Sequence, residues 1–213
     1  PIEIKIVRDT INIPTLDTEL RTDGIFVIKI YSFSANSPAL FRDAIKKFAD
    51  SGSDKLILDL RGNPGGYLDA AVDISSWFLP RGKIVVTEDY GTSQKPEVFR
   101  SRGYDVFTKE LKFVILIDGG SASASEIVAG ALKDHNKATL VGSKSFGKGS
   151  VQEAIKITPE TLLKITVAKW LTPNGNSISE KGLDPDHVVE ITKKDIDNEK
   201  DPQLQKAIEI LLK

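Results

Sequence analysis

The sequence predicts an α/β fold, because short apolar strands alternate with amphipathic helical segments through the middle of the chain. Segments 55–60 and 112–118 show this most clearly: each is an apolar run that ends at a glycine-rich turn and is followed by a helical pattern. This order indicates parallel strands with right-handed crossovers. The expected strands are 24–31, 55–60, 83–89, 112–118 and 138–142, and the expected helices are 40–51, 68–78 and 124–134.

The helix expected at 124–134 has the strongest local pattern. Ile127, Val128 and Ala131 recur at three- and four-residue spacing. Glu126 lies in the first turn and Lys133 near the last, as the helix macrodipole favours. The preceding serines therefore fall at the start of a helix, directly after a buried strand.

The remaining segments are assigned by their turn residues and periodicity. Segment 90–108 is polar, which predicts a surface loop or a flap that faces the substrate. Segments 153–158 and 161–170 read as a hairpin or meander, followed by a Thr-Pro-Asn-Gly turn at 172–175. Segment 202–212 predicts a final helix with leucine and isoleucine on one face.

Composition limits the classes of function. The 213 residues include 29 basic and 30 acidic side chains, for a net charge of −1, so the charge balance favours neither nucleic acid nor an anionic membrane as a partner. There is no cysteine, which excludes disulfides and thiolate metal sites, and the two histidines argue against a metal cluster. No apolar stretch reaches the roughly 18 residues of a membrane span. We expect no metal and no cofactor.

Ser123, in the segment Gly119–Ile127, is the candidate nucleophile. A serine hydroxyl needs a neighbouring base to attack a carbonyl. At a helix start the backbone N–H groups are unpaired, so the amide of Ala124 could stabilise an oxyanion. The alternative interpretation is structural, because small residues between a strand and a helix often serve only as an N-cap and as packing.

Lys148, in the segment Ser145–Gln152, is the candidate base. A lysine must be neutral to accept a proton, so we expect burial to lower its pKa. A lone lysine between Gly147 and Gly149 can also be an ordinary solvated charge in a turn whose glycines allow positive φ. The pairing with Ser123 favours amide hydrolysis.

The turn after the strand at 55–60 is the candidate second half of the site. Gly65 and Gly66 could present a backbone N–H to a reacting carbonyl without an obstructing side chain. A glycine-rich turn after a strand can also bind phosphate, but neither common phosphate-loop motif is present.

Taken together, these motifs resemble the carboxyl-terminal processing, or tail-specific, proteases of the S41 serine peptidases. The resemblance covers nearly the whole chain, and its pieces follow the family's order. They are Phe33 with 41–50, Leu58–Gly66, Ser121–Ile127, Phe146–Gln152, Leu171–Gly175, Gly182–Asp186 and Asp201–Leu204.

The resemblance implies roles for individual residues. Ser123 would be the nucleophile and Lys148 the general base, with Gln152 orienting the lysine. Asp134 matches an acidic position sometimes implicated in the family, although a helix-terminal aspartate that fixes the next loop is the more ordinary interpretation. Without the family match, Gln152 is equally well an ordinary polar residue of a strand.

The resemblance also implies a ClpP/crotonase-like fold of layered sheets and helices, with an additional C-terminal hairpin or meander. We expect an N-terminal strand and connection at 1–22, a protease core at 23–192 and a C-terminal helical tail at 193–213 that packs on the core. Family members usually carry a PDZ domain before the core, and the alternating segment at 1–8 is typical of its last strand. Protein or peptide substrates with apolar C-termini and a location in the bacterial cell envelope or periplasm are implied as well, whereas the oligomeric state is left open.

Three rival hypotheses remain. A Ser-His-Asp triad can be composed from Ser123, His135 or His187 and an aspartate. A crotonase-like acyl-CoA enzyme would use the same kind of oxyanion hole, but would not require the pair of Ser123 and Lys148. A non-catalytic peptide-binding or scaffold protein would keep the cleft and hold its lysine protonated or out of reach.

Overall fold

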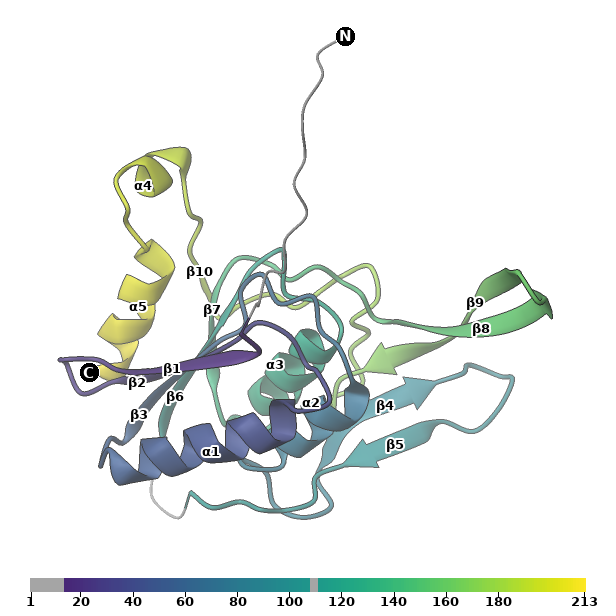
Figure 1. Cartoon of the computed structure of the whole chain (residues 1–213), viewed down its shortest axis with the longest axis horizontal. Helices are drawn as coiled ribbons and strands as arrows, with labels where there is room; N and C mark the ends of the chain where they lie inside the picture. Colours follow the sequence, from purple (N-terminus) through teal and green to yellow (C-terminus); the bar gives the residue numbers. More distant parts are fainter. Residues whose placement is uncertain (1–13, 108–110) are drawn as a thin grey trace, which may run out of the picture.

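The computed structural model describes residues 14–107 and 111–213, and it contains two sheets (Figure 1). The strand expected at 1–8 lies outside the described residues. The larger sheet has six strands in the order β1-β2-β3-β6-β7-β10. Their bounds are Leu16–Leu20 for β1, Phe26–Ile30 for β2, Lys55–Asp59 for β3, Lys112–Ile117 for β6, Thr139–Gly142 for β7 and His187–Val188 for β10.

The six-stranded sheet is parallel except at one edge. β2, β3, β6, β7 and β10 pair in parallel, and β1 pairs antiparallel with β2. Parallel sheets are covered on both faces, and for this reason the central strands read as continuous apolar runs rather than alternating ones. The α/β fold class is confirmed.

The helices of the described residues are α1 at Ser37–Asp50, α2 at Leu68–Ser75, α3 at Ala124–Asp134, α4 at Lys193–Asp197 and α5 at Pro202–Leu211, and all but the exposed α4 flank this sheet. The main apolar cluster contains residues of α1, α2 and α3, whereas α5 packs on the opposite face through Ala207, Ile208 and Leu211. Figure 1 shows α5 on the far side of the sheet from α1 and α2. The α5 helix begins where Asp201 caps it, with its side chain accepting from the Leu204 N–H, and Pro202 occupies the first turn.

The second sheet has four strands in the order β5-β4-β9-β8, all antiparallel. Their bounds are Ile84–Asp89 for β4, Glu97–Arg100 for β5, Ser150–Thr158 for β8 and Thr161–Leu171 for β9. The hairpin of β8 and β9 projects from the body of the molecule (Figure 1).

The structure corrects one expectation and adds elements at the sheet edges. Segment 90–108 is not entirely loop, because β5 lies within it and pairs with β4. The short strands β1 and β10 are not among the expected strands, whereas α4 lies within the helical tail expected at 193–213. Their residues are largely exposed, so hydrophobic periodicity carries little information about them.

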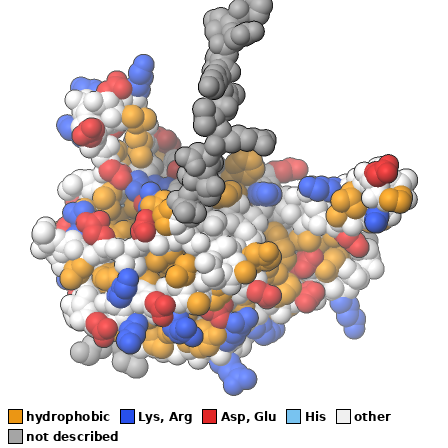
Figure 2. Space-filling model, viewed as in Figure 1, with side chains coloured by type: hydrophobic (Ala, Val, Ile, Leu, Met, Phe, Trp, Pro, Cys, Tyr) orange, Lys and Arg blue, Asp and Glu red, His pale blue; other side chains and the backbone are white. Residues whose placement is uncertain are grey.

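The visible surface carries both signs of charge, interspersed with apolar patches (Figure 2). Within residues 14–107 and 111–213, none of the helices is long and apolar enough to cross a membrane. The same residues contain no group of three or more His, Cys, Asp or Glu side chains arranged to hold a metal ion.

Candidate active site

Two turns meet at the carboxyl ends of β3 and β6. The two strands are neighbours in the parallel sheet, so the chain segments that leave them lie side by side. Asp118 joins the turns, because its Oδ1 accepts from the N–H of Gly62 at 2.8 Å and of Gly120 at 2.9 Å. The sheet therefore brings the predicted glycine turn and the predicted serine segment together.

Asn63 is a second link between these turns, and sequence reasoning assigned it no role. Its side chain is fully buried and donates to the Ile30 carbonyl at 2.8 Å. Its own carbonyl accepts from the Ala122 N–H at 3.0 Å and from the Ser125 hydroxyl at 2.9 Å. Asn63 thereby fixes the position of the residues on either side of Ser123.

Ser123 occupies the N-cap position of α3 with φ 54° and ψ −115°. A non-glycine residue in this region is strained, and such strain is characteristic of a nucleophile held on a sharp turn between a strand and a helix. The side chain is half-buried. Ala124 begins the helix, so its N–H lies among the groups that have no intrahelical acceptor.

The glycine turn lies directly against Ser123. A Cβ placed on Gly65 would lie 2.8 Å from the Ser123 Cβ and 2.9 Å from the Ala124 nitrogen. The Gly65 N–H is already committed, since it donates to Asn63 Oδ1 at 2.9 Å. Within the described residues the Gly66 N–H has no acceptor. Of the two glycines, Gly66 is therefore the one whose N–H is free to meet a substrate oxygen.

Glu126 ties the serine turn to the lysine loop, and it is the most informative residue that the sequence interpretation missed. Its carboxylate is fully buried. Oε2 accepts from the backbone N–H of Ser123 at 2.8 Å and of Lys148 at 3.0 Å. Oε1 accepts from the Ser145 hydroxyl at 2.6 Å and the Gly147 N–H at 2.7 Å.

The available signal for Glu126 was its spacing. A glutamate three residues after a capping serine is half of a capping box, in which the side chain reaches back to the N-cap N–H. We interpreted Glu126 only through the helix macrodipole. Its bonds to the loop that carries Lys148 depend on tertiary structure and have no local signature.

Lys148 is held in place through its backbone, whereas its side chain is exposed. The expected burial of this lysine is therefore wrong for the described chain. Among the described residues, no hydrogen bond or ion pair involves its Nζ, and none joins it to Ser123 or Gln152. Gln152 lies on β8 and is exposed as well.

The two glycines beside Lys148 are required for different reasons. Gly147 has φ +87°, as the turn interpretation expects. Gly149 does not have positive φ, but a Cβ there would lie 2.2 Å from the Ser179 nitrogen. The loop is thus pressed against segment 178–179, and only glycine leaves room for that contact.

Arg61 connects the glycine turn to the end of the chain. Its guanidinium makes bonds of 2.9 and 2.7 Å to the two oxygens of Asp59, and a bond of 2.9 Å to Asp201. Burial acts to lower the pKa of Arg61, but the hydrogen bonds and charges of Asp59 and Asp201 outweigh this effect and raise it. The motif at 58–66 and the motif at 201–204 are therefore parts of one ion-pair network.

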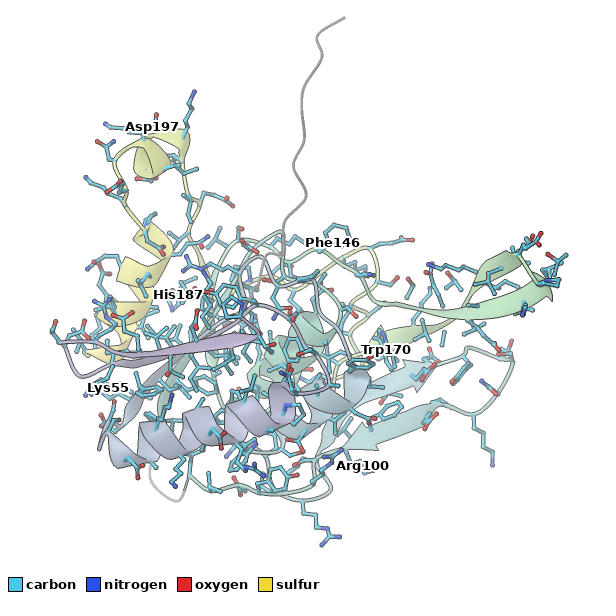
Figure 3. The ribbon with its side chains drawn as sticks, viewed as in Figure 1. Lys55, Arg100, Phe146, Trp170, His187 and Asp197 are labelled. Atoms are coloured by element: carbon cyan, nitrogen blue, oxygen red, sulfur yellow. The ribbon has the colours of Figure 1, made fainter. Side chains whose placement is uncertain are left out.

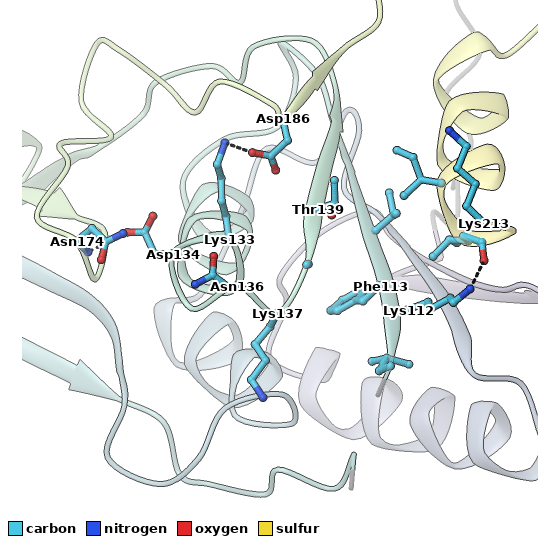
Figure 4. A pocket seen from close by; sticks show the side chains of 15 residues that line it. Lys112, Phe113, Lys133, Asp134, Asn136, Lys137, Thr139, Asn174, Asp186 and Lys213 are labelled. Carbon is cyan, nitrogen blue, oxygen red and sulfur yellow. Dashed lines mark hydrogen bonds and ion pairs between the residues drawn. The ribbon is translucent and has the colours of Figure 1, made fainter. Parts of the chain in front are cut away.

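Asp134 lies at the other end of α3, roughly 16 Å along the helix from Ser123 at about 1.5 Å per residue. It accepts from the Asn174 N–H at 2.9 Å, as the loop-fixing interpretation expects. It also lines a cavity of about 690 Å³ between the end of α3 and the end of α5 (Figure 4). The structure does not bring Asp134 to Ser123.

The two histidines are also placed away from Ser123. His135 follows the last turn of α3, and its Nε2 lies 2.8 Å from the Ile84 carbonyl oxygen. His187 lies on β10. Figure 3 labels it together with Phe146, which belongs to the loop that carries Lys148. A triad of Ser123 with either histidine has no support in this geometry.

The chain is similar to known peptidases over most of its length. The family model for Peptidase family S41 matches residues 24–189. The chain is 42% identical over 184 residues to the "Probable CtpA-like serine protease" of Staphylococcus epidermidis, which covers 86% of this chain and 37% of that protein. It is 42% identical over 194 residues to the "Carboxy-terminal-processing protease" of Bartonella bacilliformis, covering 89% and 44% of the two chains.

A solved structure, the photosystem II D1 C-terminal processing protease, matches with a TM-score of 0.77 and 26% identity, over 86% of this chain and 50% of that one. The chain spans less than half the length of the two curated relatives. The S41 match covers well over half of the chain. The chain belongs to peptidase family S41.

Proposed function

We propose that this protein is a serine endopeptidase that cleaves polypeptides near their C-terminus through a dyad of Ser123 and Lys148. The observation that carries the proposal is the shared carboxylate of Glu126, which bonds the backbones of Ser123 and Lys148 at 2.8 and 3.0 Å. A nucleophile and a base on separate loops need such a link to stay within reach of one another.

The proposed reaction has two stages. Ser123 Oγ attacks the scissile carbonyl carbon as its proton passes to Lys148 Nζ, and the N–H groups of Ala124 and Gly66 stabilise the oxyanion. The C–N bond then breaks, and the leaving amine takes the proton from Lys148. In the second stage water gives a proton to Lys148 Nζ as its oxygen attacks the acyl carbon. The bond between that carbon and Ser123 Oγ then breaks, and Lys148 returns the proton to Oγ, which releases the new carboxyl group and restores both residues.

The exposure of Lys148 bears directly on this chemistry. Lys148 must be neutral to accept the proton of Ser123. A bound polypeptide would cover Lys148 and remove water from it, which favours the neutral amine. In this proposal Lys148 becomes a competent base only when substrate covers it, and Gln152 then orients the Lys148 amine. Catalytic hydrogen bonds are often loose before substrate binds.

The free edge of the four-stranded sheet provides a place for the substrate backbone. β8 is an edge strand that begins at Ser150, two residues after Lys148. An extended polypeptide can pair with such an edge through main-chain hydrogen bonds, with alternate side chains entering pockets. We propose that substrates with apolar C-termini bind in this way.

The first experiment compares the chain with Ser123→Ala and Lys148→Ala on an unstructured protein that ends in apolar residues, with the products identified by mass spectrometry. Lys144→Ala is the matched control, since this exposed lysine lies in the same loop and pairs with Asp184 at 3.2 Å. We expect both dyad variants to lose cleavage and the control to keep it. Cleavage that survives in Ser123→Ala would eliminate the proposed nucleophile.

The exposed Lys148 favours one rival, a peptide-binding protein without catalysis. That rival predicts that the parent chain and Ser123→Ala bind the same peptide equally and that neither cleaves it. A crotonase-like enzyme would instead turn over an acyl-CoA thioester, and its activity would not depend on Lys148.

Two features of the whole protein are proposed from the family resemblance: a PDZ domain in the full-length protein, and a location in the bacterial cell envelope or periplasm. Fractionation of cells with an antibody against segment 14–107 tests the location, and recovery of the protein in the cytosol alone would refute it.

A further inference from the structure

The hairpin of β8 and β9 has an exposed apolar face. Every residue from 152 to 166 is exposed, although several are large and apolar. Ile155 and Ile165 are each 39% exposed and Leu163 is 49% exposed. Figure 2 shows apolar side chains at the projecting end of the molecule, over the hairpin. A two-stranded ribbon is marginally stable alone, so a partner that covers it would stabilise it.

The strand register places these residues on one face. Ile155 lies opposite Leu163, and Glu153 lies opposite Ile165. Directly opposite residues share a face, and successive residues of β8 alternate between faces. The register shifts between Val151 and Gln152, and Val151 lies opposite Ala168, which is 4% exposed and belongs to the buried side. The apolar row thus lies outward of the buried base of the hairpin.

At the base of this row the surface forms an acidic hollow. A cavity of about 640 Å³ is lined by residues that include Glu88, Tyr90, Gln152 and Glu153, and neither lysine nor arginine is among its described lining residues. Glu88 is 7% exposed, accepts a hydrogen bond from the Tyr90 hydroxyl and has no ion pair among the described residues. A buried carboxylate that has a neutral donor but no cation would be stabilised further by a cationic ligand.

The hollow lies beside the first residues of β8, which follow Lys148 closely in sequence. Gln152 lines it, and Gln152 is the residue expected to orient Lys148. A polypeptide paired with the β8 edge near Lys148 would therefore pass the acidic hollow first and the apolar row next. Side chains on one face of an extended strand recur at every second residue, which matches the spacing of Glu153 and Ile155 on β8.

We infer that this surface, made of the hollow at Glu88 and Glu153 and the row of Ile155, Leu163 and Ile165, binds an extended segment of the unfolded substrate in which a lysine or arginine is followed at alternate positions by apolar residues. The inference rests on the proposed peptidase function, and it assigns a sequence preference to that site. The two carboxylates of the hollow, with no lysine or arginine among its described lining residues, and the presence of Gln152 in that lining favour a cationic substrate segment as the occupant.

The test uses fluorescently labelled 20-residue peptides and the Ser123→Ala chain, with binding followed by fluorescence anisotropy. One peptide carries a lysine followed by alternating leucines, the second has glutamate in place of lysine, and the third has serine in place of the leucines. We expect the first to bind at least about fivefold more tightly than each of the others, a difference of roughly 1 kcal/mol.

Two variants test whether this surface causes the preference for lysine and leucine in the peptide. Ile155→Thr combined with Leu163→Thr keeps strand-forming residues while removing apolar area, so the hairpin is retained. It should abolish the preference for leucine. Glu153→Gln should weaken the preference for lysine over glutamate. Lys156→Thr, opposite Leu162 on the other face, is the matched control and should change neither.

The outcomes separate the two proposals. If the peptides bind as expected but the parent chain never cleaves them, the surface stands and the peptidase function fails. If the parent cleaves all three peptides with equal kcat/KM and the hairpin variants do the same, the surface is wrong and the peptidase function stands. Sedimentation that shows a dimer split by the Thr variant, with peptide binding unchanged, would assign the face to a second copy and overturn the inference.

Discussion

Glu126 accepts a hydrogen bond from the backbone N–H of Lys148 at 3.0 Å, although 22 residues separate the two in sequence. The same oxygen accepts from the Ser123 N–H at 2.8 Å. A single buried carboxylate thus fixes the two loops of the proposed dyad against each other. Because these hydrogen bonds are made to backbone N–H groups, they fix the backbone positions of Ser123 and Lys148. They do not restrict the position of the lysine amine.

Glu126→Gln is expected to reduce kcat by about 10- to 100-fold and to lower the free energy of unfolding by about 1–3 kcal/mol, the range for hydrogen bonds to charged groups. The four partners of Glu126 are all donors. A glutamine NH₂ cannot accept from them, so at least one bond is lost. Urea unfolding and kcat on a short peptide measure the two effects. Glu180→Gln, at an exposed position, is the control, and wild-type kcat in Glu126→Gln would contradict the positioning role.

Gly65→Ala is expected to abolish activity, because its Cβ would lie 2.6 Å from the Ala122 carbonyl oxygen and 2.8 Å from the Ser123 Cβ. Gly62→Ala is a control from the same turn: Gly62 also has positive φ, but its Cβ would meet nothing within 4 Å. That variant should lose only about 1–2 kcal/mol of stability to backbone strain. Peptide cleavage and thermal unfolding of both variants check the expectation, which is refuted if Gly65→Ala is as active as Gly62→Ala.

Arg61→Lys should lower the free energy of unfolding by about 1–3 kcal/mol, since lysine cannot reproduce the paired bonds to Asp59 together with the bond to Asp201. Arg61 and Asp59 are 14% and 6% exposed, so water screens this network little. Arg42→Lys is the control, because Arg42 is 66% exposed and its contact with Asp43 spans 3.9 Å. Equal urea midpoints for the two variants would show that the Arg61 network contributes no more to stability than the exposed Arg42 contact does.

Tyr90 is expected to ionise at unusually high pH, because the hydrogen bond and charge of Glu88 raise its pKa to about 12 from 10.0. A raised pKa in the folded state stabilises the fold below pH 10, and this contribution is lost as pH rises from 10 towards 12. Absorbance at the tyrosinate band, compared between the parent and Tyr90→Phe, isolates this titration. Glu88→Gln should move it back towards pH 10, and an unchanged midpoint would refute Glu88 as the cause.

The sequence by itself determined the elements whose signals are local. The limits of α3, Ala124–Asp134, agree with the expected helix, because apolar periodicity and the charges of the end turns mark both of them. The apolar runs of β3 and β6 and the glycine turn between β3 and α2 were equally readable. Ser123 and Lys148 were proposed from their small and glycine-rich surroundings together with their family pattern.

The tertiary structure decided what depends on contacts between distant segments. Some features form only when the chain folds. They include the bonds from Glu126 to the lysine loop, the pairing of β5 with β4 and the hydrogen bond of the Gly65 N–H to Asn63. The exposure of Lys148 is of the same kind, because burial depends on which segments pack over a side chain and not on its neighbours in sequence. Hydrophobic period and turn chemistry act over a few residues, and for this reason they specify elements but not the contacts that assemble a site.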